Sequence, residues 1–200
     1  MSTAPASPRR LRLTREDRLQ QLLDVSWRII REEGTDALTL GHLAAQAGVT
    51  KPVVYDHFGT RNGLLVALYE AFDRRQTAIM DAALAKSVHT LSETAAVIAS
   101  SYVDCVLTQG REIPDVLAAL AGSPELEATK RAYLVAFMEK CRAALAPLTG
   151  SGKVTTAGLW AMLGAAEALS KAAATGEITP SQAKDELSRL IVVMAAADRR

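Results

Sequence analysis

Apolar residues recur three or four positions apart through most of the chain, which is the spacing of one face of an α-helix. The first such segment begins after Thr14, with Asp17 placed to complete a capping box, and it ends at Gly34. The sequence shows neither strand-like alternation nor an internal repeat. The pattern predicts an all-α protein whose first helix turns these residues inward: Leu19, Leu22, Leu23, Ser26, Ile29 and Ile30.

Two short helices joined at a glycine are predicted between residues 39 and 59. Thr39 stands where a hydroxyl can cap a helix, and Leu40 and Leu43 follow at helical spacing. Gly48 suits the positive φ that ends this helix. Thr50 can cap the second helix, so the segment reads as a helix-turn-helix.

The second short helix has distinct inner and outer faces. Val54 and Phe58 are four residues apart and are expected to point inward, while a proline in the first turn costs no hydrogen bond. A helical hairpin with a solvated outer face is the alternative to a DNA-reading surface. The outward positions are Lys51, Pro52, Val53, Tyr55 and Asp56.

The order and spacing of these helices resemble the DNA-binding domain of the TetR (tetracycline-repressor) family over about fifty residues, as does the run Tyr55-Asp56-His57-Phe58. The resemblance implies an N-terminal three-helix helix-turn-helix domain and a C-terminal helical ligand-binding and dimerisation domain. We expect a disordered basic arm over 1–13, the DNA-binding domain over 14–60 and the second domain over 61–200.

The resemblance also implies roles for single residues. Lys51, Pro52 and Val53 match positions that look into the major groove, where Lys can donate to guanine and apolar groups can contact a thymine methyl. Thr39 and Leu40 match positions near the DNA backbone. The expected phosphate contacts are Thr50, Tyr55, His57 and Arg61.

Two positions depart from the family pattern. Gly41 stands where the first short helix often supplies a side chain to the bases, which puts that contact in doubt. Asp56 places an acid near phosphates, and it either accepts from a cytosine or pairs with a neighbouring base such as Arg61. For His57 the alternative is packing at the edge of the small core.

Charge changes this picture locally, because the whole chain carries a net charge of only +1. Arg9, Arg10, Arg12 and Arg15 all precede the first acid. Such an arm can follow a phosphate backbone or reach a minor groove. A solvated, disordered tail is the alternative.

Several classes of function are disfavoured. Residues 1–13 lack the apolar stretch of a signal peptide, no apolar run could span a membrane, and we expect a cytoplasmic protein. His42, His57 and His89 are scattered, and no nucleotide-binding loop or nucleophile–base pair stands out, so we expect no metal, no cofactor and no enzyme. Cys105 and Cys141 are expected to be reduced core residues, with a redox pair as the alternative.

Helices are expected over about 61–85, 88–109, 114–121, 124–146, 153–175 and 179–197. The last two are expected to form a homodimer, because small residues fill 153–175 and the stripe Leu187, Leu190, Ile191 and Met194 follows in 179–197. Completion of the monomer's own core is the alternative. A dimer would present two copies of the second short helix, the reader helix, one turn of DNA apart. It would therefore favour a palindromic operator.

The resemblance places an effector pocket in the second domain. Glu167 is the expected charged group, unless Lys171, four residues on, neutralises it. Each lining residue could instead be plain core. The candidates are Tyr69, Phe72, Tyr102, Cys105, Val106, Tyr133, Phe137, Met138, Trp160, Leu163 and Glu167.

The sequence thus predicts a ligand-responsive transcriptional regulator, a repressor released from double-stranded operator DNA by a small, largely apolar effector. A dimeric DNA-binding regulator without such an effector, controlled by a protein partner or its own concentration, is the alternative. A helical enzyme is a third hypothesis, which the lack of catalytic motifs disfavours.

Overall fold

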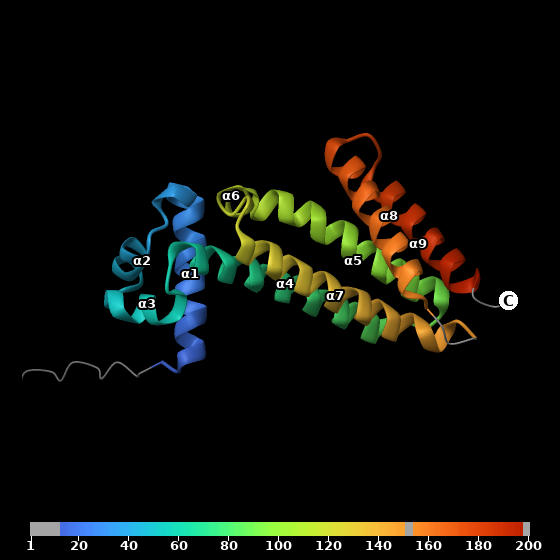
Figure 1. Ribbon diagram of the computed structural model, residues 1–200, viewed down its shortest axis with the longest axis horizontal. Coiled ribbons are helices and arrows are strands. Elements are labelled where there is room, and N and C mark those ends of the chain that lie inside the picture. The colour runs from blue at the N-terminus through green and yellow to red at the C-terminus, as the bar shows by residue number, and fades with distance from the viewer. Residues whose placement is uncertain (1–12, 151–153, 198–200) are drawn as a thin grey trace, which may run out of the picture. The chain divides into compact units, whose positions relative to one another are not determined.

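The computed structural model describes residues 13–150 and 154–197, in which every regular element is a helix, so the all-α prediction is confirmed (Figure 1). Arg9, Arg10 and Arg12 of the expected arm lie outside these ranges. The elements are α1 (Arg15–Glu33), the 3-10 turn η1 (Thr35–Ala37), α2 (Leu40–Ala47), α3 (Lys51–Phe58), α4 (Arg61–Lys86), α5 (Leu91–Glu112), α6 (Pro114–Ala119), α7 (Pro124–Leu145), the 3-10 turn η2 (Ala146–Leu148), α8 (Thr156–Thr175) and α9 (Pro180–Ala197).

Capping residues fix most of these boundaries. The Thr14 hydroxyl accepts from the Asp17 amide at 3.1 Å at the start of α1, and Gly48 takes φ 66° to end α2. The expected end of α5 at Gly110 is wrong, because the helix continues to Glu112. A helix interior tolerates a glycine at a cost of about 1 kcal/mol. Pro114 ends the helix instead, since the residue before a proline is disfavoured in the helical region.

The chain divides into two compact units, with the division between Ala67 and Leu68 inside α4. The sequence placed the division before Arg61. The first turns of α4 belong to the N-terminal unit because Leu64 and Leu65 are fully buried apolar side chains. The core of this unit also contains Leu22, Leu23, Ile29, Leu38, Leu43, Val54 and Phe58.

The C-terminal unit is organised around α5, which packs against α7, α8 and α9. Figure 1 shows α8 and α9 as a neighbouring pair beside α5. None of the described helices combines the length and apolar character needed to cross a membrane. Buried residues from α5, α7, α8 and α9 form one core, including Ile98, Ala99, Val103, Cys141, Leu145, Leu159, Leu163, Leu187 and Ile191.

Candidate DNA-binding surface and ligand cavity

The outer face of α3 is exposed as the hydrophobic pattern predicts. Val54 is fully buried and Phe58 is nearly so, which anchors the inner face of the helix. Tyr55 is 53% exposed despite its large ring. Lys51 and Pro52 are exposed and Val53 is half-buried. The helix therefore presents a cation, a phenol and two apolar surfaces to an incoming molecule.

Two threonines at the helix starts differ in what their hydroxyls do. The Thr39 hydroxyl accepts from the His42 amide at 3.1 Å and so caps α2. Thr50 occupies the same position before α3, but its side chain makes no capping hydrogen bond. Both residues are exposed. The Thr50 hydroxyl therefore remains available to a group outside the protein, such as a phosphate oxygen.

Arg61 is tied to the protein itself. Its Nε donates to the Leu38 carbonyl at 2.9 Å, and one terminal nitrogen donates to the Thr35 carbonyl at 2.8 Å. The guanidinium thus connects the start of α4 to the turn that precedes α2. These bonds use two of the five N–H donors of the guanidinium, and the expected phosphate contact of Arg61 stays a prediction.

Leu40 was expected near the DNA backbone, and that contact stays a prediction. Its side chain is 6% exposed and belongs to the core of the N-terminal unit. The apolar side chain of a first-turn residue was turned inward because Leu40 and Leu43 share one face of α2. A contact of Leu40 with DNA would therefore involve its backbone in the first turn of α2.

Asp56 pairs with Arg15, at 2.8 Å between Nη1 and Oδ2, and both side chains are exposed. The expected partner Arg61 was wrong because its guanidinium is held elsewhere. Next to this pair lies His57, which is half-buried against Phe58 with ring centroids 6.0 Å apart. Burial lowers the pKa of His57, Arg15 lowers it further, and Asp56 opposes this.

Gly41 brings α2 close to the Lys51 side chain. A Cβ built on Gly41 would lie 3.6 Å from Lys51 Cε. The aliphatic part of Lys51 therefore runs past the position where a side chain of α2 was expected to reach the bases. In this chain Lys51 occupies part of that space.

The C-terminal unit contains a cavity of about 850 Å³ between α4, α5, α7 and α8. Phe72, Met138 and Leu163 were expected to line it but do not, because they are buried on the packed sides of their helices. Cys105 lines the cavity and Cys141 is buried in the core; both thiols are free. The predicted residues that do line it are Tyr69, Tyr102, Cys105, Val106, Tyr133, Phe137, Trp160 and Glu167.

Aromatic side chains meet in two pairs along the cavity. The Tyr69 and Tyr133 rings lie 6.3 Å apart between centroids in an edge-on arrangement. The Tyr102 and Phe137 rings lie 5.4 Å apart and are tilted by 53°. Burial raises the pKa of Tyr69 to about 12, and the nearby Asp73 adds to this. Both pairs present ring faces and edges that suit apolar groups or cations.

More charged residues line the cavity than the sequence analysis expected, which named only Glu167. Asp73 was missed, although it lies four residues after Tyr69 and thus on the same face of α4. Glu167 is exposed, and in the part of the chain that the structure describes it forms no ion pair with Lys171. The other charged lining residues are Arg74, Asp81, Glu127, Lys130, Arg131 and Lys140.

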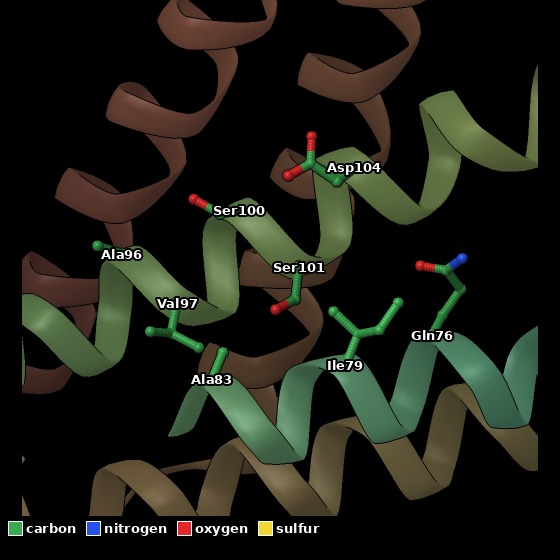
Figure 2. A pocket seen from close by; sticks show the side chains of 8 residues that line it. All are labelled: Gln76, Ile79, Ala83, Ala96, Val97, Ser100, Ser101 and Asp104. Carbon is green, nitrogen blue, oxygen red and sulfur yellow. The ribbon is translucent and has the colours of Figure 1, made fainter. Parts of the chain in front are cut away.

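A smaller hollow of about 330 Å³ adjoins this cavity between α4 and α5. Figure 2 shows Gln76, Ile79 and Ala83 of α4 facing side chains of α5. Gln76 and Ser101 line both hollows. These two polar side chains therefore form the shared wall.

Exposed apolar side chains remain on the two helices expected to dimerise. Trp160 on α8 is about half exposed, and Leu190 and Val193 on α9 are 41% and 65% exposed. Ala165 is half-buried and packs against the core of its own chain. The exposed residues leave an apolar surface on α8 and α9, whereas Ala165 also serves the core.

Burial raises the pKa values of the Cys105 and Cys141 thiols to about 12, which keeps both protonated and unreactive near neutral pH. Cys105 is half-buried and Cys141 is buried. Among the described residues no group of His, Cys, Asp and Glu side chains is arranged to hold a metal ion.

The N-terminal part of the chain matches a known family model. Residues 22–68 match the model for bacterial regulatory proteins of the tetR family. The regulator BetI from Burkholderia mallei is 36% identical over 80 residues, which cover 36% of this chain and 41% of BetI. The chain therefore aligns with about two fifths of the length of this relative.

Solved structures share the fold over most of the chain. A transcriptional regulator of the TetR/AcrR family from Thermobifida fusca has a TM-score of 0.64 and 19% identity, covering 88% of this chain and 97% of that one. The multidrug binding protein EbrR, solved with imidazole, has a TM-score of 0.63 and 18% identity, covering 87% and 89%. At these identities the likeness shows the fold.

Proposed function

We propose that the chain is a ligand-responsive regulator of the tetR family of bacterial regulatory proteins, and that it binds a palindromic operator as a homodimer. The family and the relatives found are regulators of transcription and not enzymes. Release of the DNA, as a repressor, would follow binding of a small effector in the cavity of the C-terminal unit. The observation that carries the proposal is the exposed outer face of α3 within the matched residues 22–68.

On this surface, different side chains are proposed to contact the bases and the phosphates. Lys51 is exposed and can donate to guanine O6 and N7, and Pro52 and Val53 supply apolar contact for a thymine methyl. Thr50 and Tyr55 are the side chains best placed for phosphates, since the Thr50 hydroxyl caps nothing. Arg61 supports them indirectly by holding the turn before α2.

Exposed apolar side chains on α8 and α9 support dimerisation through these two helices. Trp160, Leu190 and Val193 leave large apolar surfaces that a second copy of the same helices would cover. Two copies related by a two-fold axis would present two α3 helices to half-sites about 34 Å apart. This arrangement explains why a palindrome is the expected operator.

The cavity supplies the second binding site that an effector needs. Its volume of about 850 Å³ is within the range of small-molecule sites, and its aromatic pairs suit an apolar body. Helix α4 contributes Leu64 and Leu65 to the N-terminal unit and Tyr69 to the cavity wall. A ligand that shifts α4 would therefore bias DNA binding, with a coupling free energy of about 1–3 kcal/mol.

The test is capture of genomic DNA fragments by the purified protein, followed by footprinting of the retained fragments. The proposal expects a protected inverted repeat, with a bound dimer shown by sedimentation. Uniform retention of all fragments, or protection by a monomer, would contradict it. A cavity that shows no thermal shift with any small molecule would favour the alternative regulator without an effector.

A further inference from the structure

Most charges around the cavity are already matched by an opposite charge. Lys130 pairs with Glu127 at 3.3 Å, Lys140 pairs with Asp81, and Arg74 pairs with Glu70 at 3.9 Å. Arg131 is exposed. Among the described residues, Asp73 is the one charged lining residue that is half-buried and has no ion pair within 4.0 Å.

Aromatic and polar groups surround the Asp73 carboxylate. Its charge acts on the phenols of Tyr69 and Tyr133 and on the Cys105 thiol, which places all three close to it. The Tyr69 and Tyr133 rings meet edge-on at 6.3 Å. The carboxylate thus lies near two tyrosine rings that also line the cavity.

This environment compensates the ionised carboxylate only in part. Burial raises the pKa of Asp73, opposed by the neighbouring Arg74 and a hydrogen bond with Thr77. A cation placed here would gain the attraction of the carboxylate and of the negative ring faces together. An anion would instead meet a half-buried negative charge.

We propose that the cavity selects an organic cation with an apolar body, with its positive group against Asp73 and the rings of Tyr69 and Tyr133. The apolar body would lie along Tyr102 and Phe137, whose rings form the second aromatic pair. The inference rests on the proposed function and specifies its effector class. Glu167, which acts on Tyr102 and is exposed, is a second acid in the cavity wall and strengthens the preference for a cation.

The experiment compares three probes of equal chain length: decyltrimethylammonium, decanol and decanoate. Affinities for the 200-residue chain are measured by isothermal titration calorimetry. The cation is expected to bind at least tenfold more tightly than decanol, and decanoate more weakly than decanol. Equal affinity of cation and decanol, or tighter binding of decanoate, would overturn the proposal.

Variants locate the positive group. Asp73→Asn should lower the affinity for the cation about tenfold and leave that for decanol unchanged. The matched control Glu139→Gln removes the same charge from exposed α7, outside the cavity, and should change neither affinity. A loss with Glu167→Gln equal to that with Asp73→Asn would move the positive group to the other aromatic pair and overturn the Asp73 assignment. If Asp73→Asn does not fold, Tyr133→Leu at a half-buried position provides a second variant. It should lower the affinity for the cation and leave the affinity for decanol unchanged.

Operator release is measured separately by fluorescence anisotropy of a footprinted duplex. If decanol binds as well as the cation and both release the DNA, the proposed function stands and the cation inference fails. If the cation shows its preference but no duplex is bound specifically, the proposed function fails and the ligand class of the cavity stands.

Discussion

Single side chains divide into those that hold the N-terminal unit together and those that are exposed for the proposed contact with DNA. Arg61 donates two hydrogen bonds to the carbonyl oxygens of residues 35 and 38, while the side chains of Lys51 and Tyr55 are exposed. Asp56 and Arg15 form an ion pair with each other at the surface. The division implies that stability and DNA affinity respond to different substitutions.

Arg61→Ala should lower the free energy of unfolding by about 2–4 kcal/mol, because two charge-assisted hydrogen bonds to backbone carbonyls are lost. Urea denaturation without DNA measures this. The control Arg15→Ala breaks an exposed ion pair and should cost about 0–1 kcal/mol. An Arg61→Ala protein as stable as the parent would show that Arg61 is not structural.

Operator affinity should rise as the pH falls from 8 to 6. The pKa of His57 is lowered in the free protein by burial and Arg15, and a nearby phosphate would raise it again. Binding then takes up protons, so it is stronger at low pH. Anisotropy titrations at constant salt should show this slope in the parent and a smaller one in His57→Gln. Identical slopes would argue against a phosphate near His57.

At the scale of elements, the two helices of the reader motif are held at their starts in different ways. Helix α2 relies on the Thr39 hydroxyl, whereas α3 has Pro52 in its first turn and no side-chain cap. The inner faces of both helices are buried. Buried packing and the first-turn proline therefore stabilise the start of α3 without a side-chain cap. The Thr50 hydroxyl remains free to bind a group outside the protein.

Thr39→Ala should cost about 1 kcal/mol of stability, as loss of a helix cap generally does. Thr50→Ala should lower the free energy of unfolding by only a few tenths of 1 kcal/mol, because the Thr50 side chain caps nothing. It should nevertheless weaken binding to all DNA sequences. Thermal unfolding and anisotropy titration of the two variants separate the effects. The reverse pattern would mean that Thr50 caps α3 and does not contact phosphate.

Helix order could be predicted from the sequence because periodicity and caps are local signals, as Thr14, Gly48 and Ser123 illustrate. Side-chain partners could not, because they join distant segments: Arg61 with residue 38, and Arg15 with Asp56. The cavity shows the same limit. Tyr69 and Asp73 share a face of α4, but only the fold shows that Phe72, beside them in sequence, turns into the core.

At the scale of the whole molecule, assembly and DNA reading should be linked. An isologous interface through α8 and α9 would bring two copies of α3 to one operator. Since a single half-site supplies only part of the contacts, a monomer should bind much more weakly. Ala165 is a poor probe of this, because it packs against the core of its own chain.

Val193→Arg should dissociate the dimer and lower operator affinity at least tenfold, because it places an unpaired charge in an apolar interface. The substitution should leave the fold intact, since Val193 is 65% exposed in the single chain. Sedimentation velocity at micromolar concentration and anisotropy titration provide the two readings. A folded monomer with full operator affinity would contradict assembly through these helices.

Selection from a random-sequence duplex library tests most directly whether α3 reads DNA sequence. We expect the parent to enrich an inverted repeat with half-site centres about 10 base pairs apart. Lys51→Ala should enrich the same repeat with relaxed preference at one base pair in each half-site, a loss of about 1–3 kcal/mol of discrimination. No enriched sequence, or an enriched repeat that Lys51→Ala leaves unchanged at every position, would contradict the account.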